Sequence, residues 1–382
     1  MMRKRVLRFA EIIIMIAVMF ISFAVLCDAK GNLLYAESNS LYSDNVDELL
    51  SLLDDDTIEL LNSLGIDNYS PENIGNISIK DAFSALIGIF SGAFQEPFVC
   101  LCSVFGLIIM ISLAESYISK ESEFSDFIEF LGSMFVSLLI FSNAVECISD
   151  SVAALHTVSV LTKALIPVMA AITAFAGAPA MAVSYNAAAL YSAEIISGIC
   201  VDFLTPLLCI FAAMAVCGAV NSSVKINPIL AMIKKIFSVI LGLSGTVFTG
   251  IIAIKDVLAS GIDKVSVKGI KFILGSSVPV VGGVLSEGLS SVISAAVLMK
   301  NAYGIFGIIV IAVVSLPVIC ELLLWLAALT GASYAAEAFS QDKTAGILSS
   351  LKFVFSMLLS LVLFSVFILI ISTAMVILMS SK

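Results

Sequence analysis

The segment from Met357 to Met379 contains no charged residue. Such a run indicates a chain that folds in a lipid bilayer and not in water. About 20 consecutive apolar residues are enough for a helix to cross the hydrocarbon core of a bilayer. Other apolar runs occur at residues 98–114, 127–145 and 236–254, and of these only 127–145 contains a charge, at Glu129. Only 13% of the 382 residues are charged, about half the share in soluble domains. The sequence therefore predicts an all-α, polytopic transmembrane helical bundle with about seven spans.

The N-terminal region has the features of a secretory signal. Arg3, Arg5 and Arg8 precede apolar residues 12–26, which is the order of a basic n-region and an apolar h-region. We expect a signal peptide at residues 1–36, with cleavage after Ala29 or Ala36. An uncleaved first span is the alternative.

Residues 37–81 are predicted to form a short extracytoplasmic region ahead of a membrane domain at residues 82–382. Acidic residues greatly outnumber lysines in this region. Leucines between Leu49 and Leu64 have the spacing of one or two short amphipathic helices. About forty residues cannot bury a sufficient core alone. The region either docks on a partner or on the membrane domain, or it is a disordered acidic spacer.

Two segments of the membrane domain carry residues that interrupt helices. Residues 271–287 are apolar but contain Pro279 and the pair Gly282 and Gly283, and an earlier segment contains Pro167, Gly177 and Pro179. Broken helices survive in a membrane only where protein or a water-filled cavity receives their backbone groups. Interrupted segments in two halves of a chain also point to a site near the middle of the membrane. We expect these residues to break helices and to line a cavity.

Several acidic residues lie in or near apolar runs. An intramembrane carboxylate is costly and marks an ion path, a proton relay or a polar helix contact. The candidates are Glu194, Asp202, Glu287 and Glu321, with Glu129 more peripheral. Glu194 and Asp202 are about two helical turns apart and are expected to face one lumen. The alternative is that some of them sit at span ends and reach water.

Enzymatic and metal chemistry are not expected. The chain has one histidine, His156, and its eight cysteines form no C-x-x-C pair, so neither a zinc site nor a redox pair is predicted. The P-loop, H-E-x-x-H and G-x-S-x-G patterns are missing. We therefore predict no enzyme activity and no cofactor. No basic patch could neutralise a nucleic-acid backbone, so nucleic acid is not expected as a partner.

Helix ends and orientation are predicted from proline and lysine positions. A first helix at residues 82–94 is expected to end at Gln95-Glu96-Pro97, and residues 147–164 are expected to form a separate amphipathic helix. Residues 302–336 are expected to form a kinked span and an interfacial turn. Lysines at 225, 234 and 235 predict a cytoplasmic loop. Residues 255–271 are also rich in lysine, which conflicts with a simple crossing at 236–254.

Small residues are abundant in the membrane domain. Ala170, Ala174 and Ala178 are spaced four apart, a spacing that lets helices approach closely. The pattern indicates tight packing within the bundle or within a homo-oligomer.

The chain resembles the stage III sporulation protein AE family of endospore-forming Firmicutes. The resemblance rests on residues 277–286 (SVPVVGGVLS) and on residues 298–304 (LMKNAYG). It implies a multi-pass protein of the mother-cell membrane around the forespore. Its implied partners are the other stage III sporulation proteins of a secretion-like channel complex. No catalytic residues come with the family.

Three functions remain as hypotheses. The first is a non-enzymatic component of this channel complex, needed for spore development. The second is a stand-alone secondary transporter that couples ions through Glu194, Asp202 or Glu287. The third is a structural membrane scaffold that recruits partners through residues 37–81.

Overall fold

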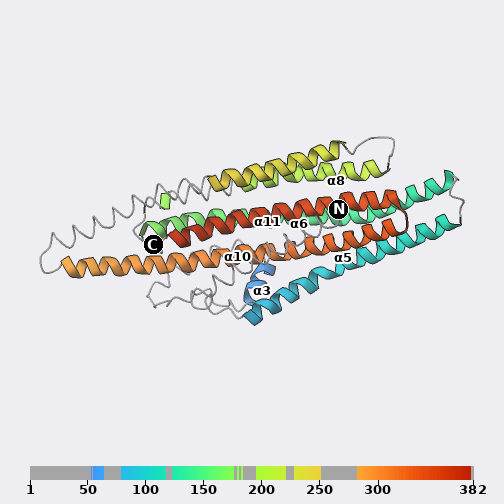
Figure 1. The fold of residues 1–382 in the computed structure, drawn as a ribbon. Coiled ribbons are helices and arrows are strands. Elements are labelled where there is room, and N and C mark those ends of the chain that lie inside the picture. Colours follow the sequence, from blue (N-terminus) through green and yellow to red (C-terminus); the bar gives the residue numbers. More distant parts are fainter. Residues whose placement is uncertain are drawn as a thin grey trace.

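The computed structural model describes residues 53, 55–63, 79–117, 123–175, 179, 182–183, 195–220, 228–250, 282–379 and the connections within those ranges. Within this part every regular element is a helix (Figure 1). Six of the described helices are long and apolar enough to cross a membrane. The predicted all-α membrane bundle is therefore confirmed. The predicted signal peptide lies outside the described residues.

Four long helices form the body of the bundle. They are α5 (Ile79–Ser116), α6 (Glu123–Phe175), α10 (Gly282–Ala338) and α11 (Asp342–Met379). Short connections join α5 to α6 and α10 to α11, so each pair is antiparallel (Figure 1). The largest hydrophobic core lies between these helices and includes Trp325 and Phe355, whose rings stack 5.6 Å apart.

The helices are longer than the sequence analysis predicted. α5 continues through Gln95-Glu96-Pro97, and α6 continues through residues 147–164 and Pro167. A proline removes one helical hydrogen bond and its ring crowds the preceding turn, but packing on both sides can hold a helix together. The helix end at residue 94 and the break at Pro167 were therefore wrong. The interfacial turn within residues 302–336 was also wrong, because α10 passes through Pro317.

A three-residue turn connects α10 to α11. The Gln341 N–H donates to the Ala336 carbonyl, and the Ser340 N–H donates to the Glu337 carbonyl. This is the Schellman pattern, which places one residue in the left-handed region. Ser340 takes that position with a φ of 59°. The Gln341 side chain is fully buried and donates to the Ile108 carbonyl at 2.8 Å, which ties the turn to α5.

Three further helical segments lie against the bundle. The π-helix η1 (Ile196–Leu204) runs directly into α8 (Thr205–Val220), and another helix covers Pro228–Gly250. The Lys234 ammonium lies 3.9 Å from the ring centre of Phe353 on α11 and 5.4 Å from that of Phe211 on α8. These contacts join the outer helices to α11.

The short helix α3 (Asp55–Ser63) belongs to the predicted extracytoplasmic region. Its Leu61 is completely buried in a second core cluster, together with Leu165 of α6 and Phe306 of α10. Of the two expectations for this region, docking on the membrane domain therefore holds for α3.

Candidate functional site: an acidic cavity

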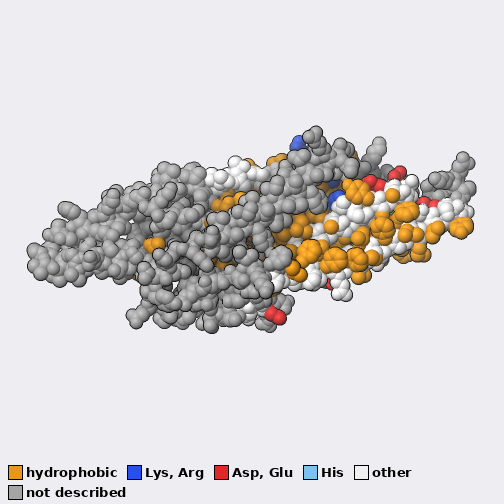
Figure 2. Space-filling view, turned by 60° about the horizontal axis from the view of Figure 1, so that its bottom comes forward, with side chains coloured by type: hydrophobic (Ala, Val, Ile, Leu, Met, Phe, Trp, Pro, Cys, Tyr) orange, Lys and Arg blue, Asp and Glu red, His pale blue; other side chains and the backbone are white. Residues whose placement is uncertain are grey.

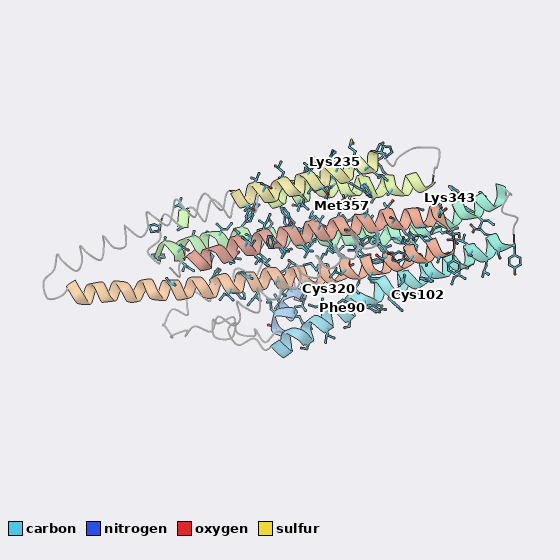
Figure 3. All side chains as sticks on the ribbon, viewed as in Figure 1. Phe90, Cys102, Lys235, Cys320, Lys343 and Met357 are labelled. Carbon is cyan, nitrogen blue, oxygen red and sulfur yellow. The ribbon has the colours of Figure 1, made fainter. Side chains whose placement is uncertain are left out.

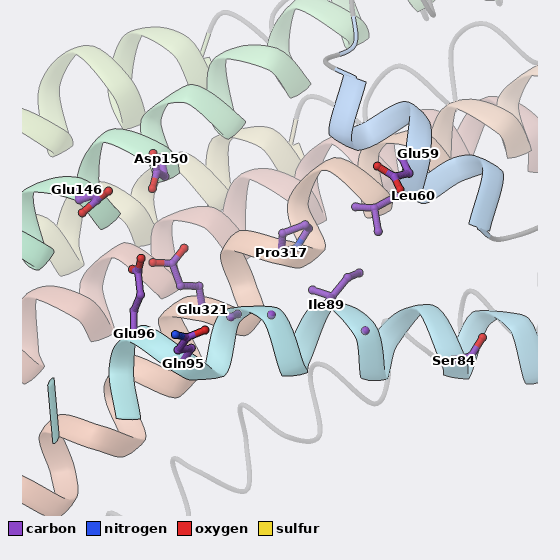
Figure 4. Close-up of a pocket in the computed structure, with 13 residues that line it drawn as sticks. Glu59, Leu60, Ser84, Ile89, Gln95, Glu96, Glu146, Asp150, Pro317 and Glu321 are labelled. Atoms are coloured by element: carbon purple, nitrogen blue, oxygen red, sulfur yellow. The ribbon is translucent and has the colours of Figure 1, made fainter. Parts of the chain in front are cut away.

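A cavity of about 1020 Å³ lies where α3, α5, α6 and α10 meet (Figure 4). Its polar lining consists mainly of carboxylates. α5 contributes Glu96 and Gln95, α6 contributes Glu146 and Asp150, α10 contributes Glu321, and α3 contributes Glu59. In Figure 4 the side chains of Glu96 and Glu321 extend toward the two acids of α6. Four segments distant in sequence thus direct acids at one space.

The helical repeat explains how α6 supplies two carboxylates. Glu146 and Asp150 are four residues apart, so they lie one above the other on one helix face. Both side chains are exposed to the cavity side of the helix, whereas neighbouring Cys147 is buried at 2% exposure. The helix therefore turns its two acids toward the cavity and the side chain of Cys147 toward α10.

Glu321 is the most constrained of these acids. The Cys147 thiol donates to its Oε1 atom at 2.9 Å, and the Trp325 indole N–H donates to the same atom at 3.3 Å. Trp325 is one turn further along α10, and Cys147 comes from α6. The two donors fix the position of the carboxyl group and connect two long helices through a polar contact.

Prolines lie in two of the helices that line the cavity. Pro97 removes the helical partner of the Ala93 carbonyl, and Ala93 lines the cavity. Pro317 lies one turn before Glu321 and itself lines the cavity. Two helices thus have incomplete backbone hydrogen bonding beside a polar space, which is where such backbone is tolerated in a membrane protein.

The charges that line the cavity are of one sign. No lysine occurs among the described residues that line it. Glu96 and Asp150 are close enough to Glu321 for their charges to act on it. Carboxylates brought together in this way repel one another, and protons or other cations relieve that repulsion. The described residues contain no group of three or more side chains placed to hold a metal ion.

The acids predicted from the sequence do not all line the cavity. Of the predicted acids, Glu321 lines the cavity, whereas Asp202 is exposed on η1 and does not. Glu194 and the side chain of Glu287 lie outside the described residues. Of the two predicted acids whose side chains the structure describes, only Glu321 therefore lies at the cavity.

The predicted helix breaks are also spread out. Pro167 and Pro179 are exposed and do not line the cavity. Gly282 and Gly283 begin α10, so the break expected there coincides with a helix start. Gly177 and Pro279 lie outside the described residues.

Sequence reasoning missed Glu59, Glu96, Glu146 and Asp150 as members of one site. The pair at 146 and 150 has a readable signal, because acids four residues apart between two apolar stretches indicate one polar helix face. Glu96 was interpreted as part of a helix end, so its place inside a long helix was not foreseen. Only the fold could show that α3 returns to the cavity.

These features define a polytopic α-helical membrane protein with an acidic cavity between its long helices. The sequence model of the stage III sporulation protein AE family matches residues 66–380, and the chain belongs to that family. It is 26% identical over 167 residues to the stage III sporulation protein AE of Bacillus subtilis (strain 168). That alignment covers 44% of this chain and 42% of the relative, so it spans less than half of either. No solved structure matches the chain.

Proposed function

We propose that this sporulation membrane protein is a non-enzymatic component of a multi-protein, secretion-like channel complex between mother cell and forespore. We place it in the mother-cell membrane around the forespore, with the acidic cavity as its functional centre. Family membership supports the role in sporulation. The observation that carries the proposal is the cavity itself, with five carboxylates contributed by four helical elements.

The cavity has the size and charge for a site that receives cationic groups. Its volume of about 1020 Å³ is at the upper end of the range for small-molecule sites. A recess lined by charges of one sign concentrates ions of the opposite sign. Protons, small cations and basic segments of a partner protein all carry the positive charge that such a recess attracts.

The test is the spore yield of a host that carries Glu321→Gln or Asp150→Asn in place of the native residue. Both changes remove one negative charge and nearly preserve side-chain volume. We expect the spore yield to fall by at least roughly tenfold, while the abundance of the protein in the membrane stays normal, because the cavity loses attraction for cations. Glu337→Gln is the matched control, because Glu337 is an exposed acid in the last turn of α10, away from the cavity. A normal spore yield for both cavity variants would contradict a role of the cavity in sporulation.

The start of α10 gives a second test of the channel role. Gly282 and Gly283 begin this helix, and we propose that an interruption at these glycines shapes the conduit. Gly283→Leu is expected to block forespore development at normal protein abundance, because a bulky side chain opposes the interruption. Normal spore formation would contradict a functional break at this position.

A stand-alone cation-coupled transporter is the second candidate, and the same carboxylates favour it. The purified protein in liposomes would then move a solute without partners, and Glu321→Gln would abolish the flux. A flux that appears only when partner proteins are added would favour the channel complex.

A further inference from the structure

The exposed face of α6 changes character partway along the helix. Up to Val145 its exposed positions are mostly large and apolar: Phe127, Leu131, Met134, Phe135, Leu138 and Val145. From Glu146 to Ala174 no large apolar side chain is exposed on this helix, and the terminal Phe175, 75% exposed, is the one exception in this half. The exposed positions there are polar, small or proline: Glu146, Ser149, Asp150, Ala153, His156, Lys163, Pro167, Ala171 and Ala174. The first face suits acyl chains, and the second suits water.

Helix α3 docks on the second half of α6. Its Leu61 packs among residues of α6 from Leu161 to Met169 and residues of α10 from Tyr303 to Val313. The helix also carries Asp55, Asp56 and Glu59. Three acids in nine residues are costly in hydrocarbon, so this level of the bundle is incompatible with the interior of a bilayer.

Helix lengths support the same boundary. α6 has 53 residues and is about 80 Å long, far more than the roughly 30 Å of a hydrocarbon core. The part of α5 from Pro97 to its end is about 30 Å long, and the part of α6 from Glu123 to Val145 is about 34 Å long. One bilayer therefore fits between the level of the cavity acids and the α10–α11 turn. Figure 2 shows a broad hydrophobic surface over the end of the molecule that contains this turn.

Most of the apolar residues of α10 and α11 that the structure describes in the other half are buried, with Phe367 at 51% exposure as an exception. Phe306, Ile311, Leu361 and Val366 are each at most 1% exposed. Their apolar character is explained by packing inside the bundle, since side chains that no solvent reaches carry no information about that solvent.

We propose that the bilayer surrounds only the half of the bundle between the acidic cavity and the α10–α11 turn. The second half of α6, the first half of α10 and α3 then stand outside the hydrocarbon, and the cavity opens at the membrane surface. Lys343 lies near the α10–α11 turn, whereas Lys235 lies at about the level of Cys320, the neighbour of the cavity residue Glu321 (Figure 3). The helix Pro228–Gly250 runs parallel to α11, because Lys234 meets Phe353 and Gly245 approaches Phe364.

The experiment measures cysteine modification in proteoliposomes with a charged, membrane-impermeant maleimide present on both sides of the membrane. The variants are Leu131→Cys and Leu138→Cys in the first half of α6, and Ala153→Cys and Ala171→Cys in the second. All four positions are exposed. Thiols react as thiolates, which form in water and not among acyl chains. We expect the Ala153 and Ala171 variants to react at least roughly tenfold faster than the two leucine variants.

The native chain supplies the blank, and its exposed cysteines Cys102 and Cys209 are measured in the same way. Two controls test whether access to the thiol, and not misfolding, sets the reaction rates. All four variants should be fully modified in sodium dodecyl sulfate, and their unfolding midpoints should equal that of the native chain. Equal protection of all four positions would place both halves in lipid and overturn the proposal. Equal reactivity would overturn it as well, because the first half would then lie in water.

Discussion

The α10–α11 hairpin and the α5–α6 pair are both antiparallel and strongly apolar, yet they are solvated differently. In the most apolar segments of α10 and α11, 61% and 67% of residues are buried inside the protein, against 28% and 44% in α5 and α6. The first pair is surrounded by protein, whereas the second presents much of its apolar surface outward. Hydropathy alone does not separate these two situations.

Polar groups follow the same division. Inside the central hairpin, Ser315, Ser365 and Thr373 are buried and each donates to the carbonyl four residues earlier. A hydroxyl satisfied by its own helix needs no partner on another helix. Glu321 differs, since it accepts hydrogen bonds from its own helix and from α6. Polar contacts thus couple the two pairs at the cavity, as the Gln341 side chain does at the α10–α11 turn.

The largest expected effect comes from removing a ring of the central hairpin. Phe355 is fully buried and stacks on Trp325, so Phe355→Ala should destabilise the protein by about 3–5 kcal/mol. Thermal unfolding in detergent measures the change. Phe135→Ala is the matched control, because Phe135 is 60% exposed on α6, and its midpoint should hardly move. Similar losses for both would contradict the division between the two pairs.

A smaller effect is expected at the close contact between α5 and α6. A Cβ atom added at Gly132 would meet the Ile111 side chain, whose Cγ1 atom would be only 2.6 Å away. Gly132→Ala should therefore cost about 1–3 kcal/mol through overpacking. At Gly106 of α5 nothing lies within 4 Å of such an atom. Gly106→Ala should raise the unfolding midpoint slightly, because alanine favours helix; a lower midpoint would indicate an unrecognised contact there.

The link between the pairs is tested at the cavity. Glu321→Ala leaves the Cys147 thiol and the Trp325 N–H without their acceptor, and orphaned donors cost about 1–3 kcal/mol. Glu321→Gln keeps a carbonyl oxygen as acceptor and should remain close to the native midpoint. If both variants unfold at the same temperature, the two hydrogen bonds contribute nothing to stability.

The smallest effect is expected at the turn of the central hairpin. Ser340 has a positive φ, a conformation that costs a non-glycine residue roughly 1 kcal/mol. Ser340→Gly should therefore stabilise the protein by about 1 kcal/mol, visible as a higher unfolding midpoint. Ser349→Gly, an exposed change inside α11, should lower the midpoint instead.

The membrane environment of the chain was easier to predict from the sequence than the bounds of its helices. Runs such as 98–114 leave few alternatives to a membrane bundle, and the family resemblance rested on motifs that a sequence alone displays. Helix ends were harder to predict, because Pro97, Pro167 and Pro317 each weaken a helix locally but do not end it. Packing over many turns outweighs one missing hydrogen bond, and packing partners are not visible in the sequence.

The cavity could be predicted only in part. Glu321 was recognised because it interrupts an apolar run. Its neighbours Glu96 and Asp150 were not combined with it, since they are about 50 residues or more apart from one another in sequence and meet only when α5, α6 and α10 align. Glu59 reaches the same space only because the apolar face of α3 packs on the bundle.

Trp325 is the only tryptophan of the chain, and its indole N–H ends on the carboxyl group of Glu321. Fluorescence excited in the tryptophan band therefore originates beside the cavity. Protonation of that carboxyl, or arrival of a cation, changes the electric field at the ring and hence the emission maximum. The unlabelled protein thus contains an optical reporter of what enters the cavity, and a titration can be followed without introducing any dye.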